Sequence, residues 1–265
     1  MQKIKISHEV PKCLLDESLH FNDYNYALPH LLDKDETYEN FFYESKKLGI
    51  ECYLDNSVHE NGVPYKTDRL LYWIEELLPT NFFVPDIIEN MSESIVKAKE
   101  WTKFLLPDGV EKVPVVQAKS LKEAIECTQI YKDLGYKKLA YPYASSYYNE
   151  VSNHPNKDIG KALGRVQVIS KIYEMGLLTK NDRIHLLGTS CPFEFSLYKD
   201  IECIESIDTS NPVMCAIENI RYNHLGIHNK PKSNLNTHFD IDVKDIDLSL
   251  LGHNLNIFKQ IINTI

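Results

Sequence analysis

Short apolar runs alternate with longer amphipathic segments along most of the chain. The short runs predict buried strands, and the longer segments, with apolar residues three and four positions apart, predict helices. The predicted strands lie near Lys12–Leu15, Glu51–Leu54, Phe82–Val84, Val113–Val116, Lys138–Tyr141, Ile184–Leu187 and Cys203–Ile207. The predicted helices lie at Glu36–Leu48, Asp68–Leu78, Glu93–Leu105, Leu121–Leu134 and Lys157–Met175.

The ends of several predicted helices carry chemical signals. Asn90 with Glu93, and Ser120 with Glu123, have the spacing of a capping box, in which a polar side chain accepts from a backbone N–H of the first turn. Three helical stretches are followed by a glycine that closes the helix before the next strand, at Gly49, Gly135 and Gly176.

Alternating strands and helices with short connections predict a parallel sheet. We expect a single α/β domain over residues 1–265, a (β/α)₈ TIM-type barrel, because such a barrel needs about 250 residues. Seven strands are visible, so the eighth is expected after residue 212, within an irregular segment at about 213–254 that precedes a closing helix at Leu255–Ile262. An open doubly wound sheet is the alternative, but no glycine-rich phosphate loop follows the first predicted strand.

Composition excludes several classes of protein. The chain is 43% hydrophobic and 25% charged, as in ordinary globular domains. No apolar run approaches the roughly 18 residues of a membrane span, and the N-terminal MQKIKISHEVPK has no apolar stretch typical of a secretion signal. We therefore expect a cytoplasmic protein.

The six cysteines occur singly and form no CxxC pair. This pattern predicts reduced, buried thiols rather than a disulfide framework, and no metal or other cofactor. A site built from Cys215 and nearby histidines is the alternative for zinc; the histidines are His224, His228, His238 and His253.

The net charge of −9 argues against a large non-specific nucleic-acid surface, although it allows a local basic one. The segment 221–232 contains three formal positive charges and no acid. It is either a solvated loop or a nucleic-acid contact, and in the second case Arg221, Lys230 and Lys232 are the contacting residues.

Polar residues follow one predicted strand after another, at Asp55, Asp86, Gln117, Gly188, Thr189 and Asp208. In a parallel barrel these positions share one rim, where active sites are built. A single carboxylate at such a position can instead cap the next helix. Asp55 and Asp208 form the sharpest pair, because a retaining glycosyl exchange uses one carboxylate as nucleophile and another to move a proton.

The segment RIHLLGTSCPFEFSLYKDIECIESIDTSNPV resembles a pattern of the tRNA-guanine transglycosylase family: a strand, a glycine turn, a proline, and a strand that ends in the nucleophilic aspartate. In this chain these elements are His185–Leu187, Gly188, Pro192 and Asp208. YLDNSVHENG resembles the region of the family's acid/base aspartate, here Asp55.

Three further segments resemble the parts of that family that bind the base. FFVPDIIEN implies that Asp86 reads the base, and VPVVQAKS implies the same of Gln117. KLAYPYA stands where the family has glycines, here replaced by Ala140 and Tyr141. The residues expected to bind the substrate are Asn56, Asp86, Gln117, Ala140, Tyr141, Gly188 and Thr189. Tyr143 is a further candidate for stacking on the base, and His59 and Glu60 are candidates for substrate contact.

The likeness spans roughly residues 50 to 212 and is strongest to the short phage-type members that insert 7-deazaguanines into DNA. The tRNA enzymes carry a Cys-x-Cys-x-x-Cys zinc motif after the nucleophile, whereas this chain has only Cys215 there. The resemblance implies that a preQ₀-like base replaces guanine in single-stranded or flipped DNA through a covalent aspartyl intermediate. The alternatives are a tRNA-directed transglycosylase, a nucleosidase, and a non-catalytic barrel that binds 7-deazaguanines.

Overall fold

Two parallel four-stranded sheets form the centre of the α/β protein, whose computed structural model describes residues 3–264. One sheet has the order β1 (Lys5–Ser7), β8 (Ile204–Asp208), β7 (Arg183–Leu187) and β6 (Lys138–Pro142). The other has the order β2 (Asn25–Ala27), β3 (Cys52–Leu54), β4 (Asn81–Phe83) and β5 (Glu111–Val113). Because all neighbouring strands are parallel, the carboxyl ends within each sheet lie on one side.

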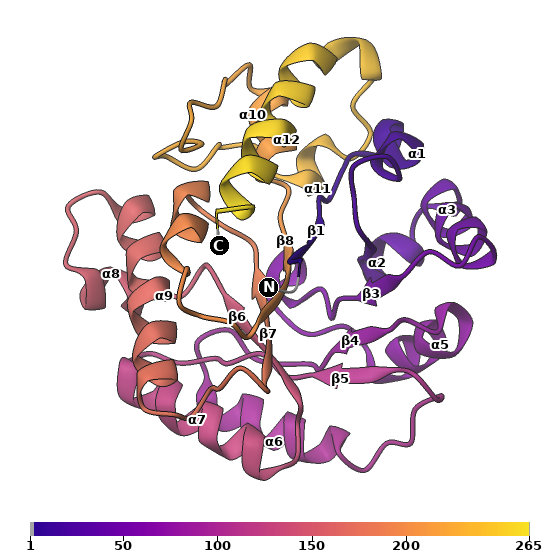
Figure 1. Ribbon diagram of the computed structural model, residues 1–265. Helices are drawn as coiled ribbons and strands as arrows, with labels where there is room; N and C mark the ends of the chain where they lie inside the picture. Colours follow the sequence, from indigo (N-terminus) through magenta and orange to yellow (C-terminus); the bar gives the residue numbers. More distant parts are fainter. Residues whose placement is uncertain (1–2, 265) are drawn as a thin grey trace.

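Helices follow most of the strands and lie around them (Figure 1). The longer helices are α3 (Glu36–Lys47), α5 (Thr67–Leu77), α6 (Met91–Trp101), α7 (Leu121–Asp133), α9 (Lys157–Glu174) and α12 (Leu248–Ile262). The shorter helices are α1 (Leu15–Ser18), α2 (Pro29–Leu32), α4 (Val58–Asn61), α8 (Tyr147–Ser152), α10 (Asn211–Ile217) and α11 (Leu235–His238). Short 3₁₀ turns occur at Lys12–Leu14, Pro192–Leu197 and Val243–Asp245.

Hydrogen bonds also join the edges of the two sheets. Just after β5, the backbone N–H of Val116 donates to the Ala140 carbonyl of β6 at 2.8 Å. The N–H of Ala140 donates back to the Pro114 carbonyl at 2.9 Å. Between the other two edges, the N–H of Asp23 donates to the Ile6 carbonyl at 2.8 Å.

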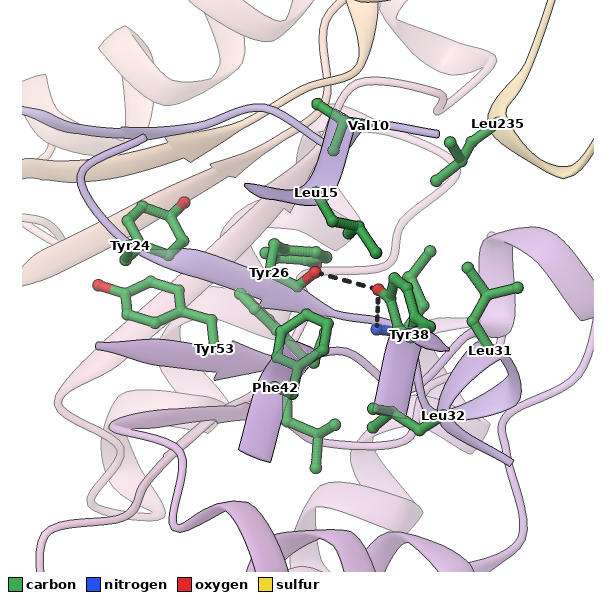
Figure 2. Close-up of a cluster of buried hydrophobic side chains, with 14 of the residues drawn as sticks. Val10, Leu15, Tyr24, Tyr26, Leu31, Leu32, Tyr38, Phe42, Tyr53 and Leu235 are labelled. Atoms are coloured by element: carbon green, nitrogen blue, oxygen red, sulfur yellow. Dashed lines mark hydrogen bonds between the residues drawn. The ribbon is translucent and has the colours of Figure 1, made fainter. Parts of the chain in front are cut away.

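Aromatic side chains pack α3 against β2 and β3 (Figure 2). The rings of Tyr24 and Tyr53 stack with their centroids 4.0 Å apart. The Tyr38 hydroxyl on α3 donates to the Tyr26 carbonyl at 3.4 Å and accepts from the Leu28 N–H at 3.1 Å. These bonds satisfy polar groups that burial would otherwise leave unpaired, and they tie the chain after β2 to the helix.

The five long helices predicted from the sequence are confirmed, to within a few residues at each end. The Asn90 and Ser120 side chains accept from the N–H groups of Glu93 and Glu123 at 3.1 and 3.2 Å, as the capping spacing predicted. The glycines that end three of these helices, Gly49, Gly135 and Gly176, all adopt positive φ. Among the described residues, no helix is long and apolar enough to cross a membrane.

The first strand was placed wrongly. Lys12–Leu15, predicted as a strand, is helical, because Pro11 precedes it and Asp16 and Glu17 supply the acidic first turn of α1. The first strand is instead Lys5–Ser7, and Asn25–Ala27 is a second strand that the prediction missed. Three-residue strands that contain polar residues give too short an apolar run to be recognised.

The C-terminal part also differs from the prediction. In the described chain no named strand follows Asp208, so the eighth strand expected after residue 212 is absent there. The segment 213–254 is irregular in its middle, but α10 occupies its start and α12 its end. The closing helix begins at Leu248 rather than Leu255, where Asp247 caps it by accepting from the Leu250 N–H at 2.9 Å.

Candidate active site

A cavity of about 540 Å³ opens at the carboxyl ends of the strands. Each of the eight named strands contributes a lining residue at its end or shortly after it: Glu9, Leu28, Asp55, Asp86, Gln117, Tyr143, Gly188 and Asp208, in the order β1 to β8. A volume of this size is typical of a pocket for a small organic ligand. Five carboxylic acids line it, and the fifth is Glu60 of α4.

Asp208 ends β8 and is buried at 4% exposure. Its Oδ1 lies 2.7 Å from Nε2 of His185, and His185 Nδ1 lies 2.8 Å from the Ser206 hydroxyl. Burial lowers the pKa of His185 far below its usual value, so the ring is neutral; we infer that Nε2 bears the proton and donates to Asp208. Burial, and next the charge of Asp55, raise the pKa of Asp208 to about 7.

Asp55 follows β3 on the opposite sheet. Its Oδ2 accepts from the Tyr26 hydroxyl, and its Oδ1 accepts from the N–H of Ser57. Burial raises the pKa of Asp55, while these hydrogen bonds act in the other direction. The Tyr26 ring lies nearly parallel to that of His185, with centroids 6.3 Å apart. Tyr26, which is bonded to Asp55, and His185, which is bonded to Asp208, therefore face each other across the interior.

Asp86 is held by two amides. Its Oδ1 accepts from Asn56 Nδ2 at 2.7 Å, and its Oδ2 accepts from Gln117 Nε2 at 2.6 Å. Asn56 uses its other N–H on the Val84 carbonyl at 2.9 Å, and Gln117 Oε1 accepts from the Glu89 N–H at 2.8 Å. Burial raises the pKa of Asp86 to about 7. Asn56 therefore orients Asp86, because both N–H groups of the Asn56 amide are already bonded.

Gly188 and Thr189, which the sequence predicted to bind substrate, line the cavity. Gly188 has φ +61°, and a Cβ there would overlap Cδ1 of Tyr143. The Tyr143 ring therefore rests directly on the glycine, and Lys230 Nζ lies 4.6 Å from the centre of that ring. The N–H and carbonyl of Gly188 are already bonded, to the Asp208 carbonyl and to Arg165.

Ala140 and Tyr141, also predicted to bind substrate, are fully buried and are not among the residues that line the cavity. The Tyr141 hydroxyl instead pairs with Thr128 Oγ1 of α7 at 2.8 Å, so this side chain packs between strand and helix. Tyr143, two residues further on, lines the cavity.

The three residues predicted to contact nucleic acid lie in two different places. Lys230 and Lys232 line the cavity. Arg221 is exposed and pairs with His253 Nδ1 of α12 at 3.1 Å, and it is not a lining residue. The segment 230–237 lies along the cavity as a continuous stretch of lining residues.

Two further groups were not predicted from the sequence: Glu9, which lines the cavity, and Arg165, which is fully buried. Glu9 was missed because its strand was misplaced. Arg165 of α9 was missed because nothing in a helical pattern marks a buried arginine. Its guanidinium donates to the carbonyls of Leu187 at 2.9 Å and Gly188 at 2.8 Å, and it pairs with the buried Glu194. This pair fixes the backbone at the end of β7, where the cavity begins.

No cluster of three or more potential metal ligands occurs within residues 3–264. Cys215, the cysteine considered for zinc, is buried on α10, with Sγ 3.7 Å from Asn211 Oδ1. Neither a scan against protein-family models nor a search of curated proteins finds a match to this chain.

Proposed function

We propose that this protein is a guanine transglycosylase that replaces guanine in DNA by a 7-deazaguanine base through a covalent intermediate on Asp208. One observation carries the proposal: Asp55 and Asp208, 153 positions apart in the chain (208 − 55), line one base-sized cavity together with an amide-braced Asp86. A retaining exchange needs such a pair, one acid to attack carbon and another to move a proton.

In the first half of the reaction, an Asp208 oxygen attacks C1′ of the nucleotide. The C1′–N9 bond breaks, its electron pair stays on guanine, and the protonated form of Asp55 supplies the proton that the leaving base takes up. In the second half, Asp55 accepts the N9 proton of the incoming base, which attacks C1′ and releases the Asp208 carboxylate. The raised pKa of Asp55 suits a group that both gains and loses a proton during the reaction.

Asp86 and Gln117 are the proposed readers of the base. Each Asp86 oxygen accepts one amide N–H and retains lone pairs that can accept from the base. A guanine-type edge presents adjacent N–H donors, which match a carboxylate held in a fixed orientation. Gln117 Nε2 has a second hydrogen for a carbonyl oxygen of the base. Tyr143 is the proposed stacking ring.

We also propose that the two sheets together form a closed (β/α)₈ barrel over a single domain. The hydrogen bonds between Val116 and Ala140, and between Asp23 and Ile6, support closure at the two places where the sheets meet. The ring of eight strand-end residues around one cavity supports the same arrangement, since barrel enzymes build their sites from the strand ends.

The nucleic acid must present an unstacked guanine, so single-stranded or flipped DNA is the proposed substrate form. Lys230 and Lys232 line the cavity, and they are the proposed contacts to the phosphates next to such a guanine. Because the net charge is −9, these local contacts would have to overcome a repulsive overall field.

The test is incubation of the protein with radiolabelled guanine or preQ₀ and, separately, single-stranded DNA, duplex DNA or tRNA. Incorporation into DNA is the expected result. Incorporation into tRNA alone, or release of guanine without exchange, would replace the proposal by a tRNA enzyme or a nucleosidase. Asp208→Asn should lower exchange by at least about 10⁴-fold, on the scale of losing a covalent nucleophile. The matched control is Asp200→Asn, an exposed aspartate outside the cavity.

A further inference from the structure

A buried histidine joins two side chains of β8 in the interior of the molecule. Residues two apart on a strand point to the same face of the sheet, so Ser206 and Asp208 share one face of β8. His185 of β7 is paired with Ser206 in the register of the two strands. Its Nδ1 lies 2.8 Å from Ser206 Oγ, and its Nε2 lies 2.7 Å from Asp208 Oδ1. The register of β7 and β8 therefore builds a hydrogen-bond network of Ser206, His185 and Asp208.

The order of this network distinguishes it from the triad of a serine hydrolase. In such a triad the serine faces the substrate, and the aspartate is buried behind the histidine. Here Asp208 lines the cavity, whereas Ser206 and His185 are fully buried and are not among the lining residues. The carboxylate is therefore the end of the network that a substrate can reach, and His185 and Ser206 lie behind it.

The position of the proton in each bond follows from the chemistry of the three groups. An ionised carboxylate only accepts, so Nε2 of His185 must carry the proton that it donates to Asp208 Oδ1. A neutral ring then has a bare Nδ1, which accepts from the Ser206 hydroxyl. Burial, and next the positive charge of Lys138, lower the pKa of His185 well below its usual value, which agrees with a neutral ring.

Charged and aromatic groups surround both ends of the network. The charged groups that act on His185, besides Asp208, are Lys138 of β6, Glu205 of β8 and Arg165 of α9. Those that line the cavity with Asp208 are Glu9, Asp55, Glu60, Asp86, Lys230 and Lys232. The rings packed around His185 are Tyr26, Tyr53 and Phe83, with centroids 4.8–6.3 Å from its own. Packing on the ring and hydrogen bonds at both nitrogens therefore aim the N–H of His185 at Asp208.

We propose that His185 is a positioning residue for the transglycosylation: a neutral N–H donor that holds Oδ1 of Asp208, so that Oδ2 is the oxygen that attacks C1′. The inference rests on the proposed function, which makes Asp208 the nucleophile. Ser206 keeps the ring in the tautomer that has its proton on Nε2. In the attack an electron pair of Oδ2 forms the O–C1′ bond, the C1′–N9 bond breaks, and its electron pair stays on guanine. His185 keeps its proton throughout.

The donated hydrogen bond acts chiefly by keeping Asp208 ionised. A buried carboxylate that lacks a donor keeps its proton to higher pH, and a protonated Asp208 cannot attack. A hydrogen bond to a charged group corresponds to about one to two pH units in the position of that ionisation. Loss of the donor should therefore lower the exchange rate at about pH 7 by roughly 10- to 100-fold, and a higher pH should restore much of the rate.

Two variants of His185 separate hydrogen-bond donation from packing. His185→Gln places an amide N–H near the position of Nε2, whereas His185→Phe retains a ring among the aromatic neighbours and donates nothing. His185→Phe should lower kcat at about pH 7 by roughly 10- to 100-fold, move the acid limb of the pH–rate profile to higher pH and leave KM for the free base within about threefold. His185→Gln should keep kcat within about threefold and the acid limb near its original position. Ser206→Ala, which frees the tautomer, should lose about 2- to 10-fold.

The control is His20→Phe, at an exposed histidine that is absent from the cavity lining. An unchanged pH profile in His185→Phe, or a folded His185→Gln variant that loses more than about tenfold, would overturn the role of His185. Nitrogen-15 NMR of the unmodified protein at about pH 8.5, where Asp208 is ionised, decides the tautomer without turnover and without any variant. Nε2 should carry the proton, and a proton on Nδ1 would refute the proposal. Absence of exchange in both the unmodified protein and the His20 control would instead refute the proposed function.

Discussion

Replacing the buried Arg165 by methionine should lower the free energy of unfolding by about 3–5 kcal/mol, the range for breaking a buried ion pair by removing one partner. The variant leaves the fully buried Glu194 without its cation. It also removes the donors to the carbonyls of Tyr141, Leu187 and Gly188, which lie 2.8–3.2 Å from the guanidinium. For a chain of this size the loss corresponds to a fall in Tm of roughly 6–20 °C.

The measurement is denaturant unfolding followed by circular dichroism, with a surface pair as the matched control. Arg183→Met breaks the contact between Arg183 and Glu111, which is 2.6 Å long but has a partly exposed arginine. That variant should lose less than about 1 kcal/mol. Adding Glu194→Leu to Arg165→Met should recover part of the stability, with a coupling free energy of at least about 1 kcal/mol.

A loss below about 1 kcal/mol for Arg165→Met, or no coupling between Arg165 and Glu194, would refute this reasoning. It would mean that water or a rearranged helix replaces the bonds of the guanidinium at the end of β7. Exchange activity should fall together with stability, because the same carbonyls shape the Gly188 side of the cavity.

Three further predictions concern the site. The rate of exchange should rise as pH increases through about 7, because Asp208 must lose its proton to attack; a rate that is flat between pH 5 and 8 would contradict the raised pKa. Gly188→Ala should reduce exchange by at least about tenfold while the protein remains folded, since the new Cβ displaces Tyr143 and alanine must adopt a positive φ. Steady-state kinetics and thermal unfolding check this prediction, and unchanged kinetics would remove Tyr143 from the site. Lys230→Met should weaken binding of single-stranded DNA and lower the salt dependence of the affinity by about one phosphate contact. Fluorescence anisotropy at several salt concentrations measures both effects. An unchanged slope of the logarithm of affinity against the logarithm of salt concentration would exclude Lys230 as a phosphate contact.

The sequence predicted well those elements whose signals are local. Asn90 and Ser120 mark helix starts through their own side-chain bonds, and long amphipathic stretches define the helices that follow. The strands that contain long apolar runs, such as Arg183–Leu187, were also found. Lys5–Ser7 and Asn25–Ala27 were not, because three-residue strands are stabilised by pairing with distant strands rather than by their own composition.

The residues of the candidate site also divide into those with a local sequence signal and those without one. Asp208 ends β8, and Asp55, Asp86 and Gln117 follow the ends of β3, β4 and β5 by one to four residues, so a rule about strand ends was enough to select them. Glu9 depends on the register between β1 and β8, which no local pattern encodes.

Side-chain direction also limited the prediction. Within the segment KLAYPYA, the direction of each side chain separates the buried Tyr141 from the cavity-lining Tyr143, and resemblance alone gave no way to choose between them.

The most direct test of the account is the search for a covalent bond between Asp208 and DNA. The protein would be incubated with a guanine-containing single-stranded oligonucleotide and no free base, quenched in acid, digested, and analysed by peptide mass spectrometry. We expect a sugar-linked adduct on the peptide that contains Asp208. The adduct should be absent from the Asp208→Asn variant, and it should be lost when free 7-deazaguanine is added before quenching. An adduct on a different residue, or an equal yield from the Asp208→Asn variant, would contradict the account.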